Sequence, residues 1–102
     1  MNLDDVKIIC DDYSKIFLQH YKPKYIVLYG SYAYGTAKEE SDFDLAFIFD
    51  DKPDNWYDIL VWLYLLLENP YYRKIQPIIV SINNDKSGFT EHILSTGIKL
   101  YS

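Results

Sequence analysis

The first stretch of the chain has the spacing of an amphipathic helix. Between residues 3 and 21, side chains that can be buried recur at intervals of three and four, and aspartates occupy other positions on the helical wheel. The recurring side chains are Val6, Ile9, Cys10, Tyr13, Ile16, Phe17 and His20. The pattern predicts a helix over residues 3–21 that packs on a sheet, with Asn2 or Asp4 as its N-cap. Pro23 then breaks this helix and leads into a strand.

Three apolar runs predict strands, over Ile26–Tyr29, Asp42–Phe49 and Ile75–Ile82. In the second run, alternate positions are apolar on one face, and on the other face apolar residues follow Asp44. A strand covered on both sides is therefore expected, as in a layered α/β domain. Pro77 indicates an edge position or an irregular start for the third strand.

Residues 55–68 predict a helix that is apolar on almost every side. From Trp56 to Leu67 only Asp58 is polar. Such a helix cannot leave one whole side in water, so one face should pack on the sheet and another on a partner protein or a second copy of the chain. The alternative is a helix enclosed within this one domain. A polar loop over 83–88 and a final helix over 89–100 complete the chain.

These elements predict one domain over residues 1–102 with a small α/β (α+β) fold. The sheet should be mixed, with three or four strands, and the helices should pack mainly on one side of it. Composition agrees with a packed globule, since 49% of the residues are hydrophobic and 18% are aromatic. The single Cys10 can form no internal disulfide and is expected to be a buried structural thiol.

Charge and hydropathy narrow the range of possible functions and locations. Fifteen acidic residues against ten basic ones give a formal net charge of −5, which disfavours long nucleic acids as substrates. The N-terminus lacks the basic and then apolar order of a signal peptide, and no apolar run approaches the roughly 20 residues of a membrane span. A cytoplasmic protein is expected.

Candidate chemistry begins where the first strand ends. Gly30 allows a sharp turn, and Ser31 is expected to cap a short helix through Ala33. The Ser31 hydroxyl and the free N–H groups of that helix start would face an anion such as phosphate. Gly35 suits the left-handed conformation that ends a helix.

Asp42 and Asp44 form the second part of the candidate site. They are two residues apart on a strand, so both side chains leave on one face, roughly 6.6 Å apart along the chain. This arrangement suits carboxylates that hold divalent metals, which in two-metal phosphoryl-transfer sites lie about 3.5–4 Å apart.

Gly30-Ser31, ten intervening residues and Asp42-x-Asp44 together resemble the minimal nucleotidyltransferases of the DNA polymerase β superfamily. Some of these are antitoxins paired with an all-helical HEPN ribonuclease toxin. The resemblance implies a nucleotidyltransferase fold, Mg²⁺ held by Asp42 and Asp44, and ATP or another nucleoside triphosphate gripped by Gly30 and Ser31. It also implies transfer of AMP to a hydroxyl of a partner protein.

Two positions depart from the family's pattern. Tyr34 stands where arginine is common, and it is expected either to stack on a base or to be a surface aromatic. Gln76 stands where a third carboxylate is expected, and an amide cannot take a proton from an attacking hydroxyl. If that carboxylate is the general base, its loss costs on the order of 10²–10⁴ in rate. Arg73 and Lys74 are candidate phosphate contacts or solvated surface charges.

Three functions follow as hypotheses. The first is the Mg²⁺-dependent adenylyl transfer to a partner protein. The second is a degenerate module that binds and neutralises or scaffolds its partner without chemistry, which Gln76 and Tyr34 favour. The third is nucleotide transfer to a small molecule such as an aminoglycoside, which the short chain disfavours because a second domain would be needed to shape that pocket.

Overall fold

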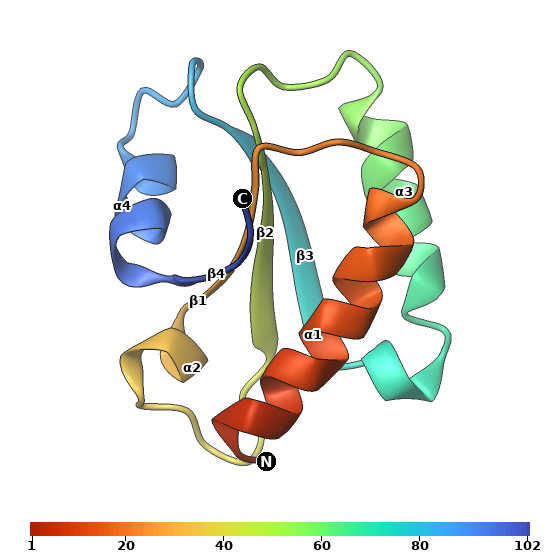
Figure 1. Ribbon diagram of the computed structural model, residues 1–102, viewed down its shortest axis with the longest axis vertical. Coiled ribbons are helices and arrows are strands. Elements are labelled where there is room, and N and C mark those ends of the chain that lie inside the picture. Colours follow the sequence, from red (N-terminus) through yellow and green to blue (C-terminus); the bar gives the residue numbers. More distant parts are fainter.

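The computed structural model describes residues 1–102, which form four α-helices, one short 3₁₀ helix and four strands (Figure 1). In chain order the elements are α1 (Leu3–Leu18), β1 (Tyr25–Tyr29), α2 (Ser31–Tyr34), β2 (Phe43–Phe49), α3 (Trp56–Leu66), η1 (Pro70–Tyr72), β3 (Ile75–Ser81), α4 (Phe89–Thr96) and β4 (Ile98–Tyr101). All three predicted strands are present within one or two residues of their expected bounds.

The strands form one mixed sheet in the order β3-β2-β1-β4. β1 pairs antiparallel with both β2 and β4, whereas β2 and β3 are parallel. β3 therefore lies at an edge, as Pro77 indicates, and its proline costs the sheet no central hydrogen bond. The predicted mixed α/β fold is confirmed.

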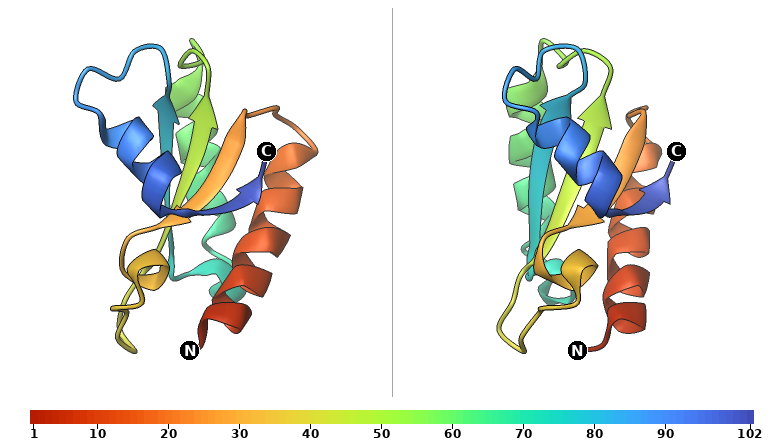
Figure 2. Two further views of the ribbon diagram at one scale, coloured as in Figure 1. Left: turned by 60° about the vertical axis from the view of Figure 1, so that its left-hand side comes forward. Right: turned by 90° about the vertical axis from the view of Figure 1, so that its left-hand side faces the viewer.

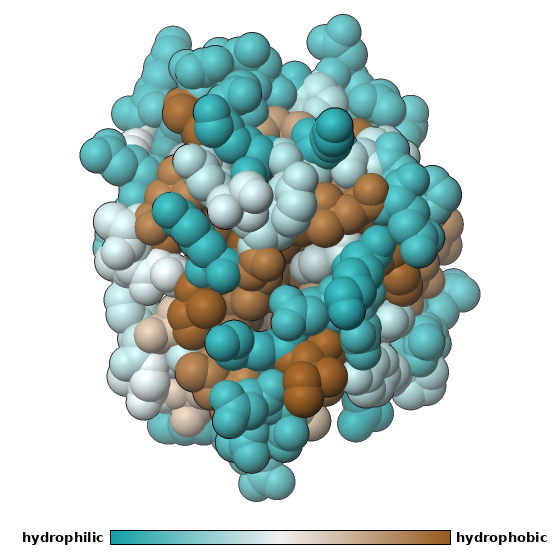
Figure 3. All heavy atoms as spheres, in the orientation of Figure 1, coloured by the Kyte–Doolittle hydropathy of each residue, from teal (hydrophilic) through white to brown (hydrophobic).

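Helices cover both faces of the sheet, but unequally (Figures 1 and 2). α1 and α3 pack on one face, around a core that includes Phe17, Phe47 and Leu63. The shorter α4 packs on the opposite face through Ile93, against Val27 and neighbouring β2 residues. The two faces are called here the α1 face and the α4 face. In Figure 3, the outer side of α1 is hydrophilic and apolar surface lies along its flanks.

α1 begins as expected and ends three residues early. The Asn2 side chain accepts a hydrogen bond from the N–H of Asp5 at 2.9 Å, which confirms Asn2 as the N-cap. At the other end, the N–H groups of His20 and Tyr21 both donate to the carbonyl oxygen of Phe17. The last turn thus tightens before Pro23, and the predicted extension to residue 21 is wrong.

The C-terminal prediction was also wrong in its second half. The expected helix over 89–100 is a helix only to Thr96, and the chain then turns at Gly97 into β4. Lys99 is exposed and the other three residues of β4 are partly buried, and this strand pairs with β1. The pairing partner is some 70 residues away in the sequence, so tertiary contacts override the helical continuation.

Gly97 is expected to be indispensable for this turn. A Cβ at this position would lie 2.7 Å from the carbonyl oxygen of Ile93 and 3.0 Å from that of Leu28, and it would collide with Val27. Since two of these obstacles are backbone atoms, Gly97→Ala should lower the free energy of unfolding by about 1–3 kcal/mol. Urea denaturation measures the change. Gly97 has φ −85°, which other residues adopt, so its cost comes from the collision, whereas Gly88→Ala, at φ +79° and with nothing within 4 Å of a Cβ, shows the cost of a left-handed backbone alone.

α3 leaves a ridge of apolar side chains in water. Ile59 and Leu63 are buried on the α1 face, and the opposite side of the helix is exposed. The ridge consists of Tyr57 (63% exposed), Val61 (43%), Tyr64 (46%) and Leu65 (57%). Because these positions are spaced by four, three and one residues, they form one continuous stripe. The alternative of an enclosed helix is therefore excluded within this chain.

The Cys10 thiol is fully buried in the core of the α1 face, as predicted. Burial, with a smaller contribution from the charge of Asp11, raises the pKa of this thiol to about 12. A thiol with this pKa stays protonated at neutral pH and is a poor nucleophile. None of the helices has the length and apolarity that crossing a membrane requires.

Asp85 secures the start of α4 and makes stability depend on acid pH. Its carboxylate accepts hydrogen bonds from the N–H and hydroxyl of Ser87 and from the N–H of Thr90, and these lower its pKa to about 2. A lowered folded-state pKa stabilises the fold above the unfolded value of about 3.9, and this stabilisation is lost as pH falls toward 2. Native protein should therefore exceed Asp85→Asn in stability at pH 7, and the difference should vanish near pH 2. Denaturation at several pH values checks this.

Candidate active site

The bend after β1 has the conformation that its glycine predicts. Gly30 has φ +78° and ψ −148°, a combination that side chains disfavour strongly. α2 starts directly after it, at Ser31, so the N-cap is Gly30 and the expected capping role of Ser31 is wrong. Gly35 ends α2 in the left-handed conformation, as predicted.

Asp44 belongs to the α4 face. It alternates along β2 with Phe43 and Leu45, which are buried on the α1 face. Across the sheet, Asp44 is paired in register with Tyr29 of β1 on one side and with Gln76 of β3 on the other. Since paired residues share a face, Tyr29, Asp44 and Gln76 form a row on the α4 face. Asp42, exposed and two residues before Asp44, adds the second carboxylate at this end of the sheet.

Gly30 and Asp44 are in close contact. A Cβ built on Gly30 would collide with Oδ2 of Asp44 and lie 3.2 Å from its carboxyl carbon. The bend and the carboxylate therefore face each other. Because Gly30 has no side chain, the Asp44 carboxylate can occupy the space beside it. Asp44 is thus the aspartate that lies against the glycine-serine bend.

The electrostatics of the row favour a bound cation. Burial first, and then the negative charge of Asp42, raise the pKa of Asp44. Burial and then the charge of Asp44 raise the pKa of Tyr29 to about 12. Two carboxylates that repel each other in a partly buried site are stabilised by a positive charge between them, because the cation offsets both repulsion and desolvation.

The donor set fits a hard divalent cation. Asp42 and Asp44 supply carboxylate oxygens, and Gln76, beside Asp44, can supply an amide oxygen, which are the ligand types that Mg²⁺ accepts. The structure contains no group of three or more His, Cys, Asp or Glu side chains that could hold a metal. Protein ligands at this site would thus come from two charged groups and one neutral group, and waters or phosphates would complete the coordination.

Tyr34 has a partner that the sequence did not reveal. Its hydroxyl forms a hydrogen bond of 2.7 Å with Nε2 of His92, which joins α2 to α4 across 58 residues. The ring is half exposed, so the expectation of a surface aromatic fits, although the side chain also tethers α2. His92 is exposed on its helix.

The Lys74 side chain contacts groups other than the two aspartates. Its Nζ donates to the carbonyl oxygen of Glu39 at 2.7 Å and lies over the ring of Phe43, whose side chain packs on the α1 face. Lys74 and Arg73 both line a hollow of about 500 Å³ with Phe43, Ile9 and residues of η1. The structure therefore groups these two cations with the α1 face and not with Asp44.

Tyr29 was missed as a site residue by sequence reasoning. Its place directly before Gly30 was visible, but it was assigned only to an apolar strand. The signal that could have identified it is its register with Asp44, which requires the strand pairing to be known.

These features define a nucleotidyltransferase, and comparison with known proteins agrees. The family model described as polymerase beta, nucleotidyltransferase matches residues 12–102. The chain therefore belongs to this family.

Relatives in Methanocaldococcus jannaschii bear the name "putative protein adenylyltransferase". One is 36% identical over 85 residues, which cover 83% of this chain and 80% of the relative. A second is 40% identical over 52 residues, covering 51% of this chain and 60% of the relative. A third is 30% identical over 86 residues, covering 71% and 88% respectively.

Two solved structures share the fold. A chain from a crystal structure of a toxin-antitoxin with AMP-PNP has a TM-score of 0.59 and 23% identity, covering 90% of this chain and 73% of that one. A nucleotidyltransferase-fold protein from Sulfolobus solfataricus has a TM-score of 0.52 and 17% identity, covering 98% and 79%. The minimal nucleotidyltransferase type inferred from the sequence fits these findings.

Proposed function

We propose that this chain is a Mg²⁺-dependent, cytoplasmic nucleotidyltransferase that transfers AMP from ATP to a hydroxyl of a partner protein. The observation that carries the proposal is the contact between Gly30 and Asp44, which brings the glycine-serine bend against one of the two carboxylates. Family membership and the names of the relatives support adenylyl transfer as the reaction.

Each site residue has a distinct role in this proposal. Gly30 lets the backbone approach the triphosphate, and the N–H groups at the start of α2, with the Ser31 hydroxyl, bind its β- and γ-phosphates. Asp42 and Asp44 hold one or two Mg²⁺ ions. The bound metal supplies positive charge that offsets the charge developing on the phosphates.

The reaction is a single displacement. The oxygen of the acceptor hydroxyl forms a bond to the α-phosphorus, the bond from that phosphorus to the bridging oxygen of the β-phosphate breaks, and pyrophosphate leaves. The hydroxyl proton passes to water, since Gln76, the side chain beside Asp44 on β3, has no basic group. The residues of this chain therefore act by positioning and by charge, and a slow reaction is expected.

The register of Gln76 supports a second function. Because the amide stands directly beside Asp44, where a third carboxylate would complete the metal site, the chain can instead be a degenerate module that binds its partner without chemistry. The same partner protein, a HEPN-type toxin in the resemblance described above, is expected in both cases.

We assign the partner to the α3 ridge, defined above as Tyr57, Val61, Tyr64 and Leu65. Asp54, Asp58 and Glu68 flank the ridge, and residues 53–72 include no lysine or arginine. A two-fold contact between copies of this chain would bring these acids together, which disfavours self-association. The chemistry fits a different protein with an apolar groove rimmed by basic side chains.

Calorimetry tests the enzymatic half of the proposal. Native protein should bind ATP when Mg²⁺ is present, and Asp44→Asn and Asp42→Asn should lose this binding. Native protein should then transfer AMP to a co-purified partner. Mass spectrometry would detect the transfer as an increase in the mass of that partner chain. Absence of Mg-ATP binding by native protein would rule out the enzyme and leave the binding module.

Co-purification tests the ridge. Leu65→Arg should release the partner encoded beside this chain, because it places a cation within the apolar contact. Ile8→Arg, an equally exposed apolar position on α1, is the matched control and should retain it. A dimer of the isolated native chain in light scattering, abolished by Leu65→Arg, would show self-association instead.

A further inference from the structure

We propose that the exposed ring of Phe89, with the hollow beside it, binds the base of the nucleotide whose phosphates face Asp44. This inference rests on the proposed function, because it needs a nucleoside triphosphate at the carboxylates. It assigns a ligand contact to α4, which the sequence motif does not include.

The first step is a path from Asp44 to Phe89. Tyr29 lies beside Asp44 in register, and its ring meets the ring of Phe89 edge-to-face, with centroids 5.9 Å apart and planes at 90°. Phe89 is 43% exposed although it belongs to a helix that packs on the sheet. The edge contact holds the Phe89 ring in a fixed orientation and leaves ring surface open, as a stacking partner requires.

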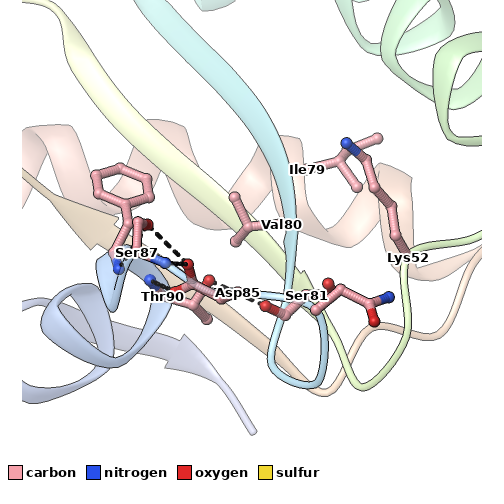
Figure 4. Close-up of a pocket in the computed structure, with 9 residues that line it drawn as sticks. Lys52, Ile79, Val80, Ser81, Asp85, Ser87 and Thr90 are labelled. Atoms are coloured by element: carbon pink, nitrogen blue, oxygen red, sulfur yellow. Dashed lines mark hydrogen bonds between the residues drawn. The ribbon is translucent and has the colours of Figure 1, made fainter.

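The second step is the hollow that Phe89 borders. It has a volume of about 290 Å³ and is lined by Val80 of β3 and by polar residues of the loop before α4 (Figure 4). In Figure 4 the Val80 side chain points toward Ser87 and Thr90, whereas Ile79 points to the other side, toward Lys52. One part of the hollow is therefore on the α4 face, the face that holds Asp44.

The dimensions suit a nucleotide. Val80 is paired with Ile48, four residues along β2 from Asp44, which places the hollow roughly 13 Å along the sheet from the carboxylate. Phe89 borders the hollow and its ring contacts Tyr29, the neighbour of Asp44, so it lies between the hollow and the carboxylate. A nucleoside that extends from a phosphate at Asp44 along the α4 face can thus bring its base to the Phe89 ring.

The polar side of the hollow can contact the edge of a base. The carboxylate of Asp85 is occupied by Ser87 and Thr90, but the side-chain amide of Asn84 forms no hydrogen bond within the chain. An amide offers both a donor and an acceptor. The hollow near Arg73 and Lys74 belongs to the α1 face and is not available to the same nucleotide.

Calorimetry with two ligands tests the inference. Mg-ATP and Mg-tripolyphosphate share the phosphates, but only ATP has a base. Phe89→Ala should weaken Mg-ATP by about tenfold, as expected for loss of one base-aromatic stack, and should leave tripolyphosphate unchanged. Phe89→Leu, which keeps apolar contact with Tyr29, should show most of the same loss, and Phe89→Tyr should restore affinity. Tyr71→Leu, an exposed aromatic on η1, is the control and should bind like native protein.

The outcomes separate this inference from the proposed function. If native protein binds both ligands and the Phe89 variants bind ATP equally well, the base site is wrong and the nucleotidyltransferase stands. If the variants bind ATP normally but transfer AMP slowly, the ring serves the acceptor, which also overturns the base site. If native protein binds neither ligand, both proposals fail.

Discussion

Gly30→Ala is expected to reduce adenylyl transfer by about 100-fold, the effect of a displacement on the order of 1 Å in a positioned reacting group. The added methyl group would collide with Oδ2 of Asp44, so the carboxylate must move away from the bend. The backbone conformation of Gly30 is also one that side chains disfavour, which should cost about 1–3 kcal/mol of folding stability. Transfer rate, Mg-ATP affinity and thermal unfolding measure these effects.

Gly35→Ala is the control for this prediction. Gly35 also has a positive φ, +77°, but a Cβ there meets nothing within 4 Å, so this variant should lose some stability and retain Mg-ATP affinity. A double-mutant cycle gives a second control. In the Asp44→Ala background the collision is absent, and Gly30→Ala should then cost less stability than in the native background. Equal Mg-ATP affinity of native protein and Gly30→Ala would contradict the proposed role of the bend.

Gln76→Glu is expected to increase the transfer rate by about 10²–10⁴-fold. The new carboxylate would stand beside Asp44 on the α4 face, where it can accept the hydroxyl proton and add a charged metal ligand. Asp42, Asp44 and the new carboxylate at position 76 repel one another without a cation. The variant should therefore melt below native protein in EDTA and recover with millimolar Mg²⁺, a shift that thermal scans measure without any acceptor.

Gln76→Leu separates the two roles of this position. It removes the amide oxygen and keeps a similar volume, so it should lower Mg²⁺ affinity if Gln76 contacts the metal. Unchanged Mg²⁺ affinity in both variants would place residue 76 outside the metal site. A faster Gln76→Glu enzyme would also support the slow reaction that we expect of native protein and would weigh against a purely structural role for the aspartates.

Sequence patterns predicted those parts of the fold that are decided locally. The alternation along β2 placed Asp44 on the face opposite Phe43, and the glycines at 30 and 35 marked the turns, because side-chain period and backbone conformation depend on neighbouring residues. The row of Tyr29, Asp44 and Gln76 depends on the strand register, and the sequence indicated only the position of Asp44 and, through the resemblance to the family, that of Gln76.

The missing parts are long-range pairings. The local pattern of residues 98–101 continues a helix, whereas the strand β4 depends on pairing with β1, far away in the sequence. The Tyr34–His92 hydrogen bond likewise joins helices that no local pattern connects. The sidedness of α3 was also hidden. Its composition indicated a second exposed face, but only the packing of Ile59 and Leu63 with the core around Phe17 shows that this helix covers the α1 face.

The sheet separates the α3 ridge from Asp44, and this has an evolutionary consequence. The carboxylate row lies on strands and the ridge lies on α3, so the two sets have no residue in common. Selection can therefore change the binding of a partner protein and the catalytic site independently. A descendant that has lost all transferase chemistry would still retain its companion, and one that has changed companions would still retain its chemistry.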